Sequence, residues 1–111
     1  MTDHAKPVVP RLAASHDIEA AVDYLAREAD YETAMRFIDA FEAACLHIST
    51  HPASGSPRFG WDLGRPGLRV WPVKGFGYLA FYSEEDDVVD LWRVLHGARD
   101  IPASLRDVIP E

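Results

Sequence analysis

The sequence predicts an α+β fold in which an antiparallel helical hairpin packs on one face of an antiparallel β-sheet meander. Apolar residues recur at helical spacing through residues 16–50, and after residue 67 they alternate as in strands. A stretch rich in proline and glycine, 51–67, separates the two halves as a loop. Helices followed by strands pack as two layers around one core, and 111 residues is an ordinary size for one domain. Residues 1–111 are therefore predicted to form a single domain.

Two amphipathic helices with almost no linker are predicted in the first half of the chain. Ser15 is expected to cap the first, a helix of about 14 residues whose apolar side consists of Ile18, Ala21, Val22, Leu25 and Ala29. Asp30 is expected to cap the second, whose apolar side consists of Ala34, Phe37, Ile38, Phe41, Cys45 and Ile48. This helix should end at His51, because the residue before Pro52 is pushed out of the helical conformation. Such a close succession indicates an antiparallel hairpin.

Three strands of a meander are predicted in the second half, at residues 68–73, 78–82 and 88–95. The joints between them are short and either glycine-rich or polar, which is a hairpin signal. One more strand is predicted before the helices, where Pro7 and Pro10 confine it to an edge of the sheet because proline cannot donate to a ladder. The tail, residues 101–109, is expected to form a short helix that begins at Pro102.

Charge is distributed unevenly along the chain, whose formal net charge is −7. Residues 16–50 carry eight acids and two arginines, which gives −6, whereas residues 58–82 carry four basic residues against Asp62, which gives +3. Binding to a nucleic-acid backbone needs several lysine or arginine contacts, and the chain has two lysines. Direct, extended binding to nucleic acid is therefore not expected, and a small basic patch in the middle third stays open.

The compartment is predicted from what the chain contains. Its single cysteine, Cys45, cannot form an internal disulfide and points to a reducing compartment. No apolar run approaches the roughly 20 residues that span a bilayer, and residues 1–10 do not resemble a signal peptide. The sequence therefore predicts a cytoplasmic protein with no membrane partner.

The usual patterns of catalysis and metal binding are not present in a specific form. His47 and His51 are spaced like two ligands on one helix face, but Ile48 occupies the place of the glutamate in the H-E-x-x-H motif. Cys45 lies on the apolar side of its helix and is most simply a core residue. No serine stands in a G-x-S-x-G elbow, and the acidic turn 84–87 is most simply a solvated tip. The sequence predicts no metal, no cofactor and no catalytic residue.

Basic and aromatic residues gather on the predicted strands. Strand alternation places Arg69, Trp71 and Val73 on one face of their strand. It likewise predicts a single face made of Val89, Leu91, Arg93 and Leu95. An arginine within such an apolar face either pairs with a carboxylate of the fold or points at a partner. Both alternatives stay open at this stage.

The order and spacing of several segments resemble the ParE/RelE superfamily of toxins. Residues 13–18 followed by Tyr24 are similar to the start of the family's first helix, and residues 48–57 (I-S-T-H-P-A-S-G-S-P) to the end of its second. Gly67-Leu68-Arg69 resembles the start of a family strand, residues 78–82 its central strand, and residues 94–100 (V-L-H-G-A-R-D) the motif that ends the last strand. The resemblance runs from about residue 8 to residue 105 and implies the same strand–helix–helix–meander order.

Two activities divide this superfamily. RelE-like members are ribosome-dependent mRNA endonucleases, whereas ParE-like members inhibit DNA gyrase by binding to it. Cleavage of RNA needs a positioned base, an acid and positive charge around the phosphate. RelE-like toxins carry a key aromatic or histidine side chain near the C-terminus, but residues 97–111 contain no Tyr, His or Lys. The resemblance therefore favours a ParE-like, non-enzymatic toxin of a type II toxin–antitoxin system; a RelE-like endonuclease and an inactive binding module remain the alternatives.

The resemblance also implies which surfaces meet the partners. Residues at the matching motif positions that are expected to contact the target are Arg69, Arg93, His96 and Arg99. The second partner is a ParD-like antitoxin, whose C-terminal segment wraps the toxin, lays an amphipathic helix in an apolar groove and sometimes adds a strand. The residues expected to contact it are Val9, Arg11, Leu25, Met35 and Leu46.

Overall fold

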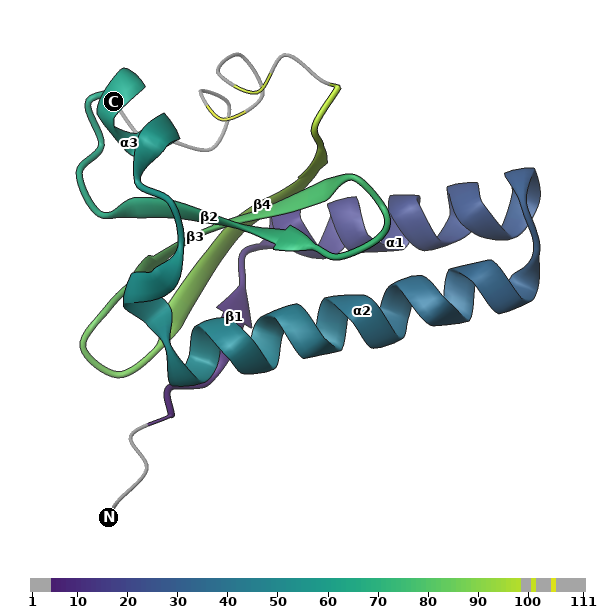
Figure 1. Cartoon of the computed structure of the whole chain (residues 1–111), viewed down its shortest axis with the longest axis horizontal. Helices are drawn as coiled ribbons and strands as arrows, with labels where there is room; N and C mark the ends of the chain where they lie inside the picture. Colours follow the sequence, from purple (N-terminus) through teal and green to yellow (C-terminus); the bar gives the residue numbers. More distant parts are fainter. Residues whose placement is uncertain (1–4, 99–100, 102–104, 106–111) are drawn as a thin grey trace.

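The computed structural model describes residues 5–98, 101 and 105. In chain order, its elements are β1 (Val8–Pro10), α1 (Leu12–Glu28), α2 (Tyr31–Thr50), the short 3-10 helix η1 (Pro52–Ser54), α3 (Arg58–Asp62), β2 (Leu68–Val73), β3 (Tyr78–Glu84) and β4 (Val89–His96). The two long helices run side by side and pack on one face of a four-stranded sheet (Figure 1). The predicted α+β fold with a helical hairpin is confirmed.

The sheet has the strand order β1-β4-β3-β2. The predicted meander is confirmed, because β2 pairs with β3 and β3 with β4 in antiparallel fashion. The predicted edge strand is also present, but it pairs parallel to β4, with Val8 opposite Val89. Parallel neighbours need a long connection between them, and here the helical hairpin and the meander together supply it. The sheet is therefore mixed.

The helical hairpin begins earlier than the sequence predicts. Arg11 is the N-cap of α1 and has an extended backbone, whereas the N–H of Ser15 already donates to the Arg11 carbonyl at 3.0 Å. The predicted Ser15 cap is wrong because Arg11 is held extended by the sheet: its N–H donates to the Leu91 carbonyl at 2.9 Å. The Asp30 cap of α2 is confirmed, since its carboxylate accepts from the Thr33 N–H at 2.7 Å. Hydrogen bonding by Thr33, first through its side chain and then through this N–H, lowers the pKa of the Asp30 carboxyl.

The segment predicted as a loop, 51–67, contains two short helices, η1 and α3. Pro52 and Pro57 stand at their N-terminal ends, where a missing N–H costs little. Gly60 lets α3 lie directly against β2, because a Cβ atom there would approach the carbonyl oxygens of Arg65 and Leu68 to 2.6 and 2.7 Å. Helices this short are below the length at which hydrophobic periodicity is visible in a sequence.

Both faces of the sheet are covered. On the helix side, buried residues of α1 and α2 pack on the sheet around Phe37, whose ring meets Phe76 and Tyr78 edge-on at 5.5 and 5.2 Å. On the other side, Phe59 of α3 and Leu63, which follows it, pack with a second buried cluster. That cluster consists of Leu68, Phe81, Trp92, Leu95, Ile101 and Leu105. The predicted tail helix lies outside the described residues apart from Ile101 and Leu105.

A β-bulge changes which residues of β4 share a face. Tyr82 pairs with Leu91 but Phe81 pairs with Arg93, so Trp92 is an extra residue in β4. Leu91 therefore packs toward the helices while Leu95 belongs to the cluster on the opposite face. The predicted single face from Val89 through Leu95 is wrong for this reason.

Among the helices in the described part of the chain, none combines the length and the apolar character needed to cross a membrane.

Candidate functional site

Arg93, one of the expected target contacts, clasps α1 to β4. Its Nε and Nη2 atoms donate to the Asp17 carboxylate at 2.6 and 2.8 Å, and the Val94 N–H donates to the same carboxylate at 2.9 Å. Only 13% of the Arg93 side chain and 10% of the Asp17 side chain are exposed. Asp17 thus binds the edge of β4 beyond the end of β1. Of the two alternatives for this arginine, the structure shows the internal pairing.

Of the two other expected arginine contacts, the structure describes Arg69 but not Arg99. Arg69 is half-buried, and its Nη1 atom donates to the Gly55 carbonyl at 2.8 Å, which holds the segment after η1 against β2. Arg99 lies outside the described residues. The two arginines that are described, Arg69 and Arg93, therefore both support the fold.

His96, at the end of β4, has an exposed side chain with a fixed ring. The Ala98 N–H donates to its Nδ1 atom at 3.1 Å, and the Tyr78 ring meets it edge-on at 5.2 Å. Gly77 leaves room for the imidazole, because a Cβ atom at that position would lie 3.0 Å from Nε2. A backbone N–H donates only to an unprotonated nitrogen, so the proton of the neutral ring is on Nε2.

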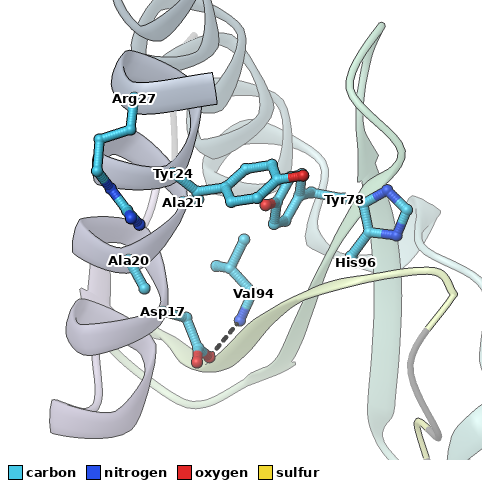
Figure 2. Close-up of a pocket in the computed structure, with 8 residues that line it drawn as sticks. All are labelled: Asp17, Ala20, Ala21, Tyr24, Arg27, Tyr78, Val94 and His96. Atoms are coloured by element: carbon cyan, nitrogen blue, oxygen red, sulfur yellow. Dashed lines mark hydrogen bonds between the residues drawn. The ribbon is translucent and has the colours of Figure 1, made fainter. Parts of the chain in front are cut away.

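His96 lines a pocket between α1 and the sheet, which we call the His96 pocket. It has a volume of about 540 Å³ and is lined by Asp17, Ala20, Ala21, Tyr24, Arg27, Tyr78, Val94 and His96. In the view of Figure 2, Arg27 and His96 stand on opposite sides with the two tyrosine rings between them. The small side chains of Ala20 and Ala21 leave the space open on the helix side.

The sequence alone did not indicate Tyr24, Arg27 or Tyr78 as site residues. One local signal was available, since Tyr24 and Arg27 are three residues apart and so share a helix face. The small residues Ala20 and Ala21 precede them and leave space on that side of the helix. Nothing in the sequence shows that Tyr78 and His96 come to lie opposite this face, because that depends on the packing of α1 against the sheet.

The polar groups of the His96 pocket are mostly hydrogen-bond donors. Among the described residues that line it, Asp17 is the one acid, and both of its carboxylate oxygens already accept from Arg93 and Val94. The accepting nitrogen of His96 is engaged by Ala98. Arg27 makes no ion pair or hydrogen bond with other residues that the structure describes. The described residues of the pocket therefore offer mainly groups that donate a hydrogen bond to an acceptor.

A second depression, which we call the hairpin groove, lies between α1 and α2. It has a volume of about 580 Å³ and is lined by Ile18, Glu19, Val22, Asp23, Ile38, Phe41 and Glu42. Leu25 continues the α1 side at helical spacing from Ile18 and Val22. Met35 and Leu46 are 38% and 67% exposed and continue the α2 side in the same way. Leu25, Met35 and Leu46 are not among the residues that line the groove, and helical spacing alone relates them to it.

The other two expected antitoxin contacts lie at the β1 edge. Val9 is 48% exposed on the outermost strand of the sheet. Arg11 forms an ion pair with Asp90, with Nη2 at 2.9 Å from the carboxylate, and its guanidinium lies 4.2 Å from the centre of the Trp92 ring. Val9 is available to a partner, whereas Arg11 already has partners within the fold.

His47 and Cys45, the candidates for metal binding and for catalysis, have surroundings that fit a structural role. The His47 ring stacks on Trp71 at 3.8 Å, and its Nε2 lies 2.8 Å from the Ser54 hydroxyl. Within the part of the chain that the structure describes, no group of three or more His, Cys, Asp or Glu side chains is arranged to hold a metal ion. Burial, with a smaller contribution from Glu42, raises the pKa of the Cys45 thiol to about 11, so it is protonated at neutral pH.

Comparisons with known proteins agree with this architecture. A solved structure described as the chromosomal ParDE TA system from P. aeruginosa contains a chain with the same fold, at a TM-score of 0.69 and 15% sequence identity. The match covers 84% of the present chain and 97% of that chain. No curated protein sequence matches. The family model for the ParE toxin of the type II toxin–antitoxin system parDE matches residues 8–101, and the chain therefore belongs to the ParE toxin family.

Proposed function

We propose that this ParE toxin inhibits DNA gyrase by binding to it, without catalysing a reaction itself, and that a ParD-like antitoxin neutralises it in the cytoplasm. The observation that supports binding over RNA cleavage is the state of the two candidate bases in the His96 pocket. Asp17 already accepts three hydrogen bonds from Arg93 and Val94, and His96 Nδ1 accepts from Ala98. A nuclease that activates a 2′-hydroxyl needs a base within reach of that proton.

Among the four expected target contacts, His96 is the one we propose to meet gyrase directly. Its side chain is exposed, and it stands beside two aromatic rings at the end of the sheet. Tyr24, which is 53% exposed, belongs to the same surface. Exposed aromatic residues beside a polar pocket are typical of residues that contribute much of the binding energy at an interface.

The test is the purified toxin added to gyrase and relaxed plasmid with ATP. We expect loss of supercoiling and the accumulation of linear DNA after protein digestion, and no cleavage without gyrase. Tyr24→Ala combined with His96→Ala should weaken inhibition at least tenfold, because both side chains are exposed and their loss leaves the fold intact. Tyr31→Ala, which removes a 74% exposed tyrosine outside the pocket, is the matched control. Rapid mRNA cleavage on ribosomes with unaffected gyrase would instead support the RelE-like activity.

We also propose that the antitoxin lays an amphipathic helix along the hairpin groove. The groove has an apolar floor with three carboxylates at its rim, Glu19, Asp23 and Glu42, which make no ion pair with other described residues. A helix that fits this groove carries apolar residues at i, i+3 or i+4, and i+7, flanked by lysine or arginine. Charge complementarity of this kind accelerates association and selects the partner.

Reversing the rim charges should weaken the complex. For the Glu19→Lys, Glu42→Lys double variant we expect antitoxin dissociation at least tenfold faster in surface plasmon resonance at low salt, and less difference at high salt. The matched control is Asp86→Lys, Asp87→Lys, which changes the net charge equally at the exposed β3–β4 turn. Equal effects of the two double variants would mean that the antitoxin responds to overall charge and does not lie in the groove.

A further inference from the structure

We infer that the His96 pocket is a binding site for a phosphate monoester. This goes beyond the inhibition of gyrase and does not depend on it. The pocket brings a guanidinium, an imidazole N–H and phenol groups from α1, β3 and β4 around one space of about 540 Å³. Pockets for small ligands commonly have volumes of this order.

Positive charge in the pocket is not compensated from within it. Arg27 makes no ion pair with other described residues, and Asp23, one turn earlier on α1, lines the hairpin groove instead. Asp17 carries a negative charge, but the Arg93 guanidinium neutralises it with two hydrogen bonds. The pocket is thus locally cationic within a hairpin whose residues 16–50 sum to −6, since eight acids stand against two arginines. Only an anionic ligand gains from that local charge.

The available groups favour phosphate over other anions. A carboxylate presents two oxygens in one plane, whereas a phosphate monoester presents three acceptor oxygens in different directions. The donors on α1, Arg27 and Tyr24, stand on one side of the pocket, whereas the His96 ring stands on the other side, next to Tyr78 (Figure 2). Hydrogen bonds to an ionised phosphate are roughly twice as strong as those between neutral groups.

The pocket also has an aromatic wall. Tyr24 and Tyr78 both line it, and Tyr24 keeps about half of its side chain exposed. A flat ring carried by the ligand gains stacking energy on such a surface. Nucleoside monophosphates and inorganic phosphate therefore share the proposed chemistry, and they differ in whether they use this wall.

The experiment is an NMR titration of the full-length, isotope-labelled toxin with inorganic phosphate, with AMP and with adenosine, at constant ionic strength. We expect saturable shifts of the His96 imidazole and of the Arg27 side-chain N–H with phosphate and AMP. Adenosine alone should shift them little, because it lacks the charged group. Tighter binding of AMP than of phosphate would show that the adenine ring contacts the aromatic wall. Equal affinities would show that the pocket binds the phosphate group alone.

Matched variants make the result specific. Arg27→Gln should weaken phosphate binding about tenfold or more, because it removes a charge-assisted contact. Arg36→Gln removes the same charge from an exposed position on α2, where the side chain contacts Thr33, and should leave the affinity unchanged. Thermal midpoints of both variants check that the fold persists. Shifts that do not saturate, or equal losses in the two variants, would overturn the site in favour of general charge screening.

Discussion

Replacing Asp17 by alanine is expected to lower the free energy of unfolding by about 3 kcal/mol, which is the low end for breaking a buried ion pair by removing one partner. The loss is large because the variant leaves the Arg93 guanidinium, which is 13% exposed, without its carboxylate. It also leaves the Val94 N–H at the edge of β4 without an acceptor. Urea denaturation should show a lower midpoint with an unchanged slope, which reports a change in stability alone.

Two comparisons decide whether the pairing is the cause. Lys6→Ala removes the Lys6–Glu84 ion pair, whose side chains are 24% and 40% exposed, and should cost at most about 1 kcal/mol. The double variant Asp17→Ala, Arg93→Ala should be less destabilised than the sum of the two single variants, because no buried charge is left unpaired. Additive losses, or a small effect of Asp17→Ala, would contradict this account. Loss of toxicity in Arg93→Ala alone therefore reports damage to the fold and identifies no target contact.

Gly55→Ala is expected to destabilise the protein by about 2 kcal/mol, a typical cost of overpacking a buried site. A Cβ atom at Gly55 would lie 2.3 Å from the Tyr82 hydroxyl and 2.9 Å from the Val70 carbonyl oxygen. That hydroxyl is buried and fully used, since it donates to the Pro52 carbonyl at 2.7 Å and accepts from the Gly55 N–H at 3.0 Å. The substitution therefore forces apart the contact that ties the segment after α2 to the middle of β3.

A double-mutant cycle checks the origin of this effect. Tyr82→Phe alone should cost about 1–3 kcal/mol, because it leaves the buried Gly55 N–H and the partly buried Pro52 carbonyl without this partner. In the Tyr82→Phe background, Gly55→Ala should cost clearly less than in the wild type, since the closest clash is with the absent hydroxyl. Equal costs in both backgrounds would show that the Val70 carbonyl, and not the tyrosine, limits the space.

The parts of the fold that sequence predicts well are those fixed by neighbouring residues. The Asp30 cap and the helix end before Pro52 follow from contacts within four residues of each position. The start of α1 does not, because the conformation of Arg11 is set by a hydrogen bond to Leu91, which is distant in the sequence. The same holds for the two faces of β4, where one extra residue, Trp92, interrupts the alternation on which the prediction depended.

Candidate site residues, too, are predicted well where local spacing determines their position and poorly where packing between distant segments does. Helical spacing relates Leu25, Met35 and Leu46 to the residues of α1 and α2 that line the hairpin groove, although these three do not line it themselves. That an antitoxin contacts them remains a prediction. The choice between an internal and an external partner for Arg93 could not be made from the sequence. It depends on Asp17, which the packing of α1 against β4 brings within 2.6 Å.

The parallel pairing of β1 with β4 has a consequence for synthesis on the ribosome. Residues 8–10 emerge early, but their partners, 89–91, emerge only when most of the chain has been made. The walls of the His96 pocket are similarly divided between residues 17–27 and residues 78–96. The helical hairpin emerges before the strands β2, β3 and β4 that it packs against, and contacts between distant segments are slow to form. On our proposal that the antitoxin lies in the hairpin groove, a nascent chain presents that groove before its sheet is closed, so capture by the antitoxin can precede completion of the His96 pocket.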